Sequence, residues 1–305
     1  MSIASARVQV NGTWHTLTYN SGNGKWEATI TAPGTTSYNQ AGGYYPVTVE
    51  ATNTASTKTT VNTTDPTVGN SLKLVVKEKV APVITIVSPA TGAYVSNAQQ
   101  PIVFTVVDES GGSGVKLSTL ALSIDGGANI GYQASGMSVT AITNGHSITY
   151  TPPSALSDGS HTVTINCQDN DGNAATQKST SYTVDTVPPT LNVTSPSEGL
   201  ITATPSLTVQ GTTNDATSSP AAVTITLNGV DQGAVTVTAG SFSKSITLAE
   251  GANVIVVTAT DLAGKTTSVT RNVTIDTTSP VISAVTITPN PADAGATVVI
   301  SVVIA

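Results

Sequence analysis

Three stretches of the chain align with one another without gaps: Gly43-Tyr-Tyr-Pro-Val-Thr-Val-Glu-Ala-Thr-Asn53, Gly159-Ser-His-Thr-Val-Thr-Ile-Asn-Cys-Gln-Asp169 and Gly251-Ala-Asn-Val-Ile-Val-Val-Thr-Ala-Thr-Asp261. In each stretch, apolar residues alternate with other residues after the glycine, and an Asn or Asp closes the segment. A period of two is typical of a strand that buries one face. The repeat therefore predicts three copies of one β-module.

Turn-forming residues accompany these strands. Asp169-Asn-Asp-Gly172 and Asp261-Leu-Ala-Gly264 come directly after two of the copies. Val8-Gln-Val10-Asn-Gly12 and Leu227-Asn-Gly229 contain the Asn-Gly pair that suits a tight type I′ turn. We therefore expect antiparallel hairpins in every module.

The composition agrees with a β-rich protein and excludes some function classes. Of the 305 residues, 10% are charged, against roughly 25% in an average domain. The formal net charge is -7 with no cluster of Lys and Arg, which argues against nucleic acid as a partner. The chain contains no run of about 18 apolar residues, so we predict no insertion into a membrane.

An acidic residue stands four positions before a proline in Glu78-Lys-Val-Ala-Pro82, Asp185-Thr-Val-Pro-Pro189 and Asp276-Thr-Thr-Ser-Pro280. Proline cannot donate to a β-ladder, so it marks the edge where a module begins. The predicted domains are 1–79 (with an inserted loop at 31–42), 80–186, 187–277 and a two-strand segment at 278–305. Modules of this size with short alternating strands indicate an all-β protein: three tandem immunoglobulin-like β-sandwiches plus a short C-terminal β segment.

The segment 278–305 is too small to bury its apolar residues. Val298, Ile300, Val302 and Ile304 share one face of a predicted strand, and an isolated hairpin is only marginally stable. Two interpretations stay open: part of a fourth module, or an assembly strand that pairs with another copy or another protein. We favour pairing, because an unpaired apolar edge promotes aggregation.

Several motifs resemble known families. Leu207-Thr-Val-Gln-Gly211, Leu248-Ala-Glu-Gly-Ala-Asn253 and Ala259-Thr-Asp-Leu-Ala-Gly264 resemble bacterial Ig-like modules, nearest to the non-catalytic module B of glucodextranase-like enzymes. Leu156-Ser-Asp-Gly-Ser-His-Thr-Val163 resembles a related module of surface and phage proteins. The module order, with the closing Thr288-Pro-Asn-Pro291, resembles tandem Ig-like proteins of bacteriophage and prophage tails.

This resemblance implies a non-enzymatic tail component that acts as a spacer or in host-surface attachment. Its partners would be other virion proteins or a bacterial cell-surface glycan. The N-terminus shows no secretion signal, and a virion or extracellular protein that is released by lysis needs none. The alternative is an extracellular bacterial adhesin or an accessory module string of a carbohydrate-active enzyme.

No catalytic residues are predicted. Cys167 aligns with Ala51 and Ala259, which indicates a small core position rather than a nucleophile. His161 aligns with Tyr45 and Asn253, which indicates a polar residue at the start of a strand. We therefore expect the protein not to be an enzyme.

Calcium is the only cofactor that the sequence leaves open. Asp169-Asn-Asp-Gly-Asn173 resembles the start of a calcium loop, but position twelve is Thr180 instead of Glu. The candidate ligands are Asp169, Asp171, Asp185 and Asp276; the acids Glu78, Asp108, Glu109 and Asp261 recur at similar places in the modules. The alternative is that Asp and Asn simply stabilise tight turns.

Aromatic residues concentrate near the N-terminus. Tyr38, Tyr44 and Tyr45 cluster around the inserted loop, and Trp14 lies on the preceding predicted strand. Loops on rigid scaffolds commonly carry binding function. These four residues are the candidates for contact with a surface glycan, and burial in the core is the alternative for each.

Overall fold

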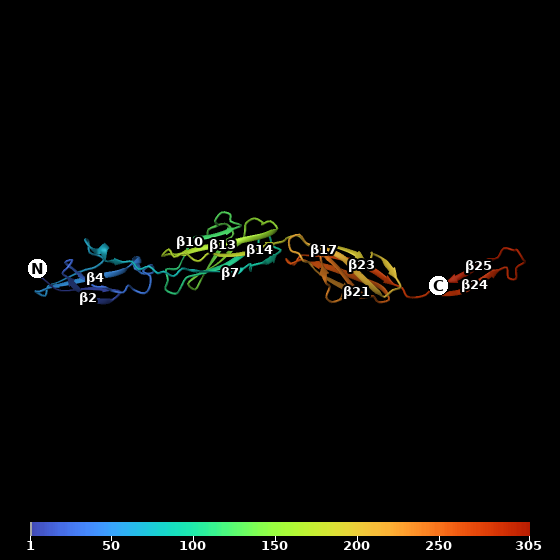
Figure 1. Ribbon diagram of the computed structural model, residues 1–305, viewed down its shortest axis with the longest axis horizontal. Helices are drawn as coiled ribbons and strands as arrows, with labels where there is room; N and C mark the ends of the chain where they lie inside the picture. The colour runs from blue at the N-terminus through green and yellow to red at the C-terminus, as the bar shows by residue number, and fades with distance from the viewer. Residues whose placement is uncertain (1) are drawn as a thin grey trace. The chain divides into compact units, whose positions relative to one another are not determined.

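β-Strands make up nearly all regular structure of the computed structural model, which describes residues 2–305 (Figure 1). Contacts divide the chain into two units, of which the first ends at Val184 and the second begins at Asp185. We use module one for residues 2–79, module two for 80–184, module three for 185–277 and C-terminal hairpin for 278–305. Asp185 and Thr186, which the sequence assigned to the second module, fall in the second of these units.

Module one is built on one antiparallel sheet. Its strands are β1 (Ile3–Val10), β2 (Thr13–Asn20), β3 (Lys25–Glu27), β4 (Tyr45–Asn53), β5 (Lys58–Val61) and β6 (Lys73–Leu74), with short 3-10 helices η1 (Ala41–Gly43) and η2 (Gly69–Leu72). The order is β3-β2-β1-β4-β5, and β6 pairs with β4. Asn11 and Gly12 have φ angles of 48° and 79°, which confirms the predicted hairpin between β1 and β2.

Module one differs from the two-sheet arrangement that the repeat predicts. On β4, Val47 and Val49 are only half-buried, whereas Glu50 on the opposite face is buried. Its carboxylate pairs with Arg7 at 2.5 Å and with Lys58 at 2.6 Å. A strand with an ion-paired face does not need a second apolar sheet, so the alternation predicted the strand but not its packing.

Module two is a sandwich of two four-stranded sheets. Its strands are β7 (Val83–Ser88), β8 (Ala93–Val95), β9 (Ile102–Val107), β10 (Val115–Ile124), β11 (Met137–Ile142), β12 (Gly145–Tyr150), β13 (Gly159–Asp169) and β14 (Lys178–Val184). The sheets have the orders β11-β12-β9-β7 and β10-β13-β14-β8. Phe104 and Ile148 from the first sheet and Leu122 and Ile165 from the second are fully buried in one core. This is the packing expected of two facing sheets; all pairs in them are antiparallel except β14 with β8.

Module three repeats this architecture. Its strands are β15 (Thr190–Ser195), β16 (Leu200–Thr202), β17 (Ser206–Asn214), β18 (Ala222–Leu227), β19 (Val230–Asp231), β20 (Val237–Thr238), β21 (Ser241–Thr247), β22 (Gly251–Thr260) and β23 (Thr266–Ile275). The sheets have the orders β15-β17-β21-β20 and β16-β23-β22-β18-β19. Val209 and Ile225 come from different sheets and share the buried core. Asn228 and Gly229 have positive φ angles, which confirms the second Asn-Gly hairpin.

The C-terminal hairpin consists of β24 (Ile282–Thr288) and β25 (Val299–Ile304), paired antiparallel. All its residues are exposed, including Val298, Ile300, Val302 and Ile304. The predicted two-strand segment therefore forms, and its apolar side chains lie in contact with solvent on both faces.

Candidate metal centres

Acidic side chains from three places converge at one end of module two. Glu78 lies in the segment before β7, Asp108 follows β9, and Asp169 ends β13. One carboxylate oxygen of each lies within 4.8 Å of the other two. We call these three residues the first carboxylate cluster.

Hydrogen bonds fix the three carboxylates. The Ser113 N–H donates to Glu78 Oε1, and the Gly114 N–H donates to Asp108 Oδ2 at 2.6 Å. The backbone N–H groups of Gly172 and Asn173 donate to Asp169 Oδ1, which closes the turn after β13. The loop between β9 and β10 thus supplies N–H groups to Glu78 and Asp108 and leaves the second oxygen of each without a partner, whereas Asp169 Oδ2 accepts from Asn173 Nδ2 at 2.7 Å.

A fourth acid, Glu109, lies against the first carboxylate cluster. The neighbouring Glu78 carboxylate, together with burial and Asp108, raises the pKa of Glu109 to about 7. Gly112 shows how crowded the oxygens are, because a side chain there would meet Asp108 Oδ2 at 2.7 Å and Glu78 Oε2 at 2.8 Å. Negative charge is therefore concentrated at this end of module two.

Module three contains the matching arrangement, the second carboxylate cluster. Asp185 precedes β15, Asp215 follows β17, and Asp261 follows β22; one oxygen of each lies within 4.8 Å of the others. All three are buried, at 0%, 7% and 6% exposure. Ser218 links two of them, since its hydroxyl donates to Asp185 Oδ2 and its N–H donates to Asp215 Oδ1 at 2.6 Å.

The predicted calcium ligands divide into two groups. Asp169 and Asp185 belong to the clusters. Asp171 does not: its Oδ2 accepts hydrogen bonds from Thr36 Oγ1 at 2.5 Å and from the Glu78 N–H at 3.0 Å. Asp276 is exposed, bonds Thr278 and belongs to neither cluster, so its role as a calcium ligand stays a prediction.

Sequence reasoning missed Asp215 altogether. The repeat could have identified this residue, because Asp215 follows Asp185 at the same spacing as Asp108 follows Glu78. The strand before Asp215, β17, carries Thr and Gly where β9 carries apolar residues. The last residues of the two strands therefore share little sequence similarity.

The candidate glycan contacts do not form one platform. Tyr45 is 3% exposed and its hydroxyl lies 2.7 Å from Thr35 Oγ1, so its prediction as a surface contact is wrong. Tyr38 is 50% exposed. Tyr44 and Trp14 are half-buried beneath cations, with Lys73 Nζ 5.3 Å and the Arg7 guanidinium 4.2 Å from the ring centres.

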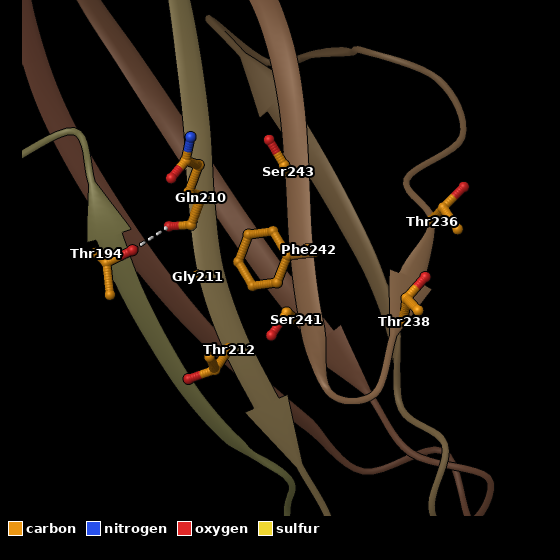
Figure 2. A pocket seen from close by; sticks show the side chains of 9 residues that line it. All are labelled: Thr194, Gln210, Gly211, Thr212, Thr236, Thr238, Ser241, Phe242 and Ser243. Atoms are coloured by element: carbon orange, nitrogen blue, oxygen red, sulfur yellow. Dashed lines mark hydrogen bonds between the residues drawn. The ribbon is translucent and has the colours of Figure 1, made fainter.

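An open groove of about 580 Å³ lies on the β15-β17-β21-β20 sheet of module three (Figure 2). Figure 2 shows the Phe242 ring beside Gly211, with threonine and serine side chains around them. The residues that line it are Thr194, Gln210, Gly211, Thr212, Thr236, Thr238, Ser241, Phe242 and Ser243. None of them titrates near neutral pH, so this groove offers surface for contact rather than acid–base chemistry.

Cys167 and His161, which align with a core position and a strand-start position of the repeat, both lie in module two. Cys167 is 2% exposed, and burial raises the pKa of its thiol. His161 is 5% exposed and hydrogen-bonded through both ring nitrogens. Across residues 2–305, no helix is long and apolar enough to cross a membrane.

Two facing, mainly antiparallel sheets with short strands define modules two and three as immunoglobulin-like β-sandwiches in tandem. Residues 112–186 match the family described as bacterial Ig-like domain, and residues 189–277 match the family described as glucodextranase, domain B. A comparison with curated proteins finds no match.

A comparison with solved structures also finds matches of low sequence identity. The fibronectin(III)-like modules of Clostridium thermocellum CbhA match with 18% identity and a TM-score of 0.42, covering 63% of this chain and 94% of that one. The I67–I69 fragment of titin matches with 11% identity and a TM-score of 0.41, covering 89% and 87%. Dimeric latent PorU from Porphyromonas gingivalis matches with 14% identity and a TM-score of 0.31, covering 90% and 30%.

Proposed function

We propose that the chain is a non-enzymatic spacer of a phage or prophage virion, placed in the tail and contributing to host-surface attachment. The observation that carries the spacer role is the hydrogen-bonded connection between modules one and two. A spacer must transmit position along the chain, and a flexible linker does not do so.

The connection uses side chains from both modules. Asp171, in the turn after β13, accepts from Thr36 Oγ1 and from the Glu78 N–H. Lys77 Nζ donates to the Asp171 carbonyl at 3.3 Å, and Asn39 Nδ2 donates to the Gly112 carbonyl at 2.6 Å. The inserted loop thus holds the segment that leads into module two, which supports a stiff joint.

Support for a virion comes from sequence. The module order and its turn motifs resemble tandem Ig-like proteins of phage tails, and the low charge suits a passive structural surface. The test is to induce and purify particles from the source strain, and then to detect the chain by mass spectrometry and by immunogold labelling. Label on tails is the expected result; particles that lack the chain would contradict the proposal.

The C-terminal hairpin supplies the proposed contact with a partner, a second copy of the chain. Ile300 and Val302 are 61% and 46% exposed, and each module sandwich covers the equivalent kind of apolar face with a second sheet. Two hairpins that pack face to face would bury both surfaces. Residues Val298, Ile300, Val302 and Ile304 would form this contact.

Light scattering on the full chain tests this pairing. We expect an oligomer that becomes monomeric when Ile300→Thr and Val302→Thr are combined, because threonine keeps the strand but removes apolar contact. The matched control changes the opposite face, Val299→Thr with Val303→Thr, and should remain associated. A monomeric wild-type chain would rule out the contact.

The match of residues 189–277 to glucodextranase domain B favours a second candidate, an accessory module string of a carbohydrate-active enzyme or an adhesin. Tyr38 is the exposed aromatic residue of the inserted loop. Binding on a glycan array that disappears with Tyr38→Ala but persists with Tyr19→Ala would support this candidate. A silent array would count against it.

A further inference from the structure

The two carboxylate clusters correspond position by position in modules two and three. We propose that each cluster binds one calcium ion, held in the first by Glu78, Asp108 and Asp169 and in the second by Asp185, Asp215 and Asp261. Calcium binding is independent of the proposed virion role, since the clusters belong to the modules wherever the chain acts.

In the first cluster, oxygens that need a partner have none. Asp108 is 3% exposed, and its Oδ1 is buried without a hydrogen-bond donor, as is Glu78 Oε2. Within residues 2–305, no Lys or Arg forms an ion pair with these carboxylates. A buried carboxylate without a counter-charge, one of whose oxygens also lacks a donor, is unfavourable, and a cation removes that cost.

The second cluster shows the same deficit independently. Asp261 is 6% exposed, and its Oδ2 is buried without a partner while its Oδ1 accepts from the Lys265 N–H at 2.8 Å. The turn therefore uses one oxygen of Asp261 and leaves the other without a donor. Each cluster thus contains at least one buried carboxylate oxygen without a partner, on Glu78 and Asp108 in the first and on Asp261 in the second, and one cation per cluster would supply it.

The spacing fits one ion in each cluster. Calcium binds oxygen at about 2.3–2.6 Å, so two oxygens on the same ion lie at most about 5 Å apart. Within each cluster, one carboxylate oxygen of every residue lies within 4.8 Å of those of the other two. All the ligands are carboxylates, which are the hard donors that calcium takes, whereas zinc prefers His and Cys.

Calcium also fits better than magnesium here. Magnesium demands a near-ideal octahedron and releases its water reluctantly, while calcium accepts irregular sets of six to eight oxygens completed by carbonyls and water. The ligands come from a linker segment, a strand end and a turn. Such a set joins the segment before β7 or β15 to the body of its module, so binding would stiffen the start of each sandwich.

Isothermal titration of the chelator-treated full chain with calcium chloride tests the proposal. We expect two calcium ions per chain for the wild type, one for Asp108→Asn, one for Asp261→Asn and none for the double variant. Asp276→Asn, which changes an exposed linker acid outside the clusters, is the matched control and should keep two. No heat at millimolar calcium, or equal binding by the double variant, would overturn the proposal.

Thermal unfolding separates loss of binding from loss of folding. Saturating calcium should raise the melting temperature of the wild type by about 5 °C or more and leave the double variant unchanged. In chelator, the double variant should melt at or above the wild type, because removal of buried negative charge relieves repulsion. A double variant that melts lower in chelator would show that these carboxylates do not repel one another without a cation. An equal response to magnesium would contradict the choice of ion.

Discussion

His161 Nδ1 lies 2.7 Å from Asp125 Oδ2, which joins the start of β13 to the turn after β10. The Thr162 N–H also donates to this carboxylate, at 2.7 Å. In module three, Asn253 and Asn228 take the corresponding places: Asn228 Nδ2 donates to Asn253 Oδ1 at 3.1 Å. One structural position thus has a titratable form in module two and a neutral form in module three.

The pair gives module two a pH-dependent stability. Burial opposes the charged imidazole, but the hydrogen bonds to the Ser157 carbonyl and to Asp125 outweigh it and raise the pKa of His161 above 6.5. Burial likewise opposes the charged carboxyl, but the bonds from His161 and Thr162 lower the pKa of Asp125 below 3.8. The stabilisation from His161 is full below pH 6.5 and is lost as the pH rises through the raised pKa. The stabilisation from Asp125 is present above pH 3.8 and is lost as the pH falls through the lowered pKa.

Calorimetry between pH 5 and 9 checks this prediction. The transition of module two should move to lower temperature as the pH rises past 6.5, and His161→Gln should reduce that movement. Module three is the internal control, because the amide side chains of its Asn228–Asn253 pair do not titrate in this range. A wild-type profile that matches His161→Gln would contradict the role of the pair.

Gly211 is required where β17 passes the Phe242 ring. A Cβ at this position would lie 2.3 Å from the Asn192 carbonyl oxygen and 2.5 Å from Phe242 Cζ. Gly211→Ala should therefore lower the free energy of unfolding of module three by about 1–3 kcal/mol through overpacking. Gly34→Ala is the control, since its Cβ meets nothing within 4 Å, and it should change stability by about 0.5 kcal/mol or less. Denaturant unfolding measures both.

The sequence predicted where strands lie better than it predicted whether a second sheet packs against them. Alternation located β13 and β22 because their inward side chains meet a second sheet, and the same alternation located β4. It did not distinguish the ion-paired face of Glu50 in module one, because a Glu on an expected outer face is unremarkable in sequence. The facing sheet is a long-range property that local periodicity does not encode.

The acidic clusters likewise depend on long-range contacts that local sequence does not encode. Asp185 and Asp276 share one sequence feature, an acid four residues before a proline, yet only Asp185 is buried with other carboxylates. The difference lies in the part of the chain that each linker leads into. Module three supplies Asp215 and Asp261, whereas the one acid of residues 278–305, Asp293, lies in the loop between β24 and β25 and forms no cluster with Asp276. Equivalent linkers therefore give equivalent sites only when they lead into a complete sandwich.

Tyr45 and Tyr38 should differ sharply in their contributions to stability, although Tyr38 lies in the inserted loop and Tyr45 follows it closely. The Tyr45 hydroxyl is bonded to Thr35 and buried, so Tyr45→Phe should cost about 1 kcal/mol of unfolding free energy in module one. Tyr38→Phe removes a solvent-exposed hydroxyl and should leave stability unchanged. Tryptophan fluorescence follows the transition, since both tryptophans lie in module one. Equal effects of the two changes would contradict the burial of Tyr45.

Cys167 should be chemically silent in the native protein. Its thiol is buried among the core residues of module two, and burial raises its pKa, so little reactive thiolate forms at neutral pH. A thiol reagent should label the chain within the mixing time in denaturant and orders of magnitude more slowly without it. Rapid labelling of the folded chain would show that this core opens.

The repeat predicts how much unfolding free energy is lost when the Cys167 thiol is removed. Ala259 fills the equivalent place in module three at 0% exposure, so the backbone and neighbours at this position already accommodate a methyl group. Cys167→Ala should therefore lower the unfolding free energy of module two by only about 1 kcal/mol, whereas Ile165→Ala, two residues away on the same face, should cost about 2–5 kcal/mol through the larger cavity. Denaturant unfolding compares them directly. If the two changes cost the same, Cys167 contributes contacts that an alanine does not replace, and the alignment of the three strands does not extend to how their side chains pack.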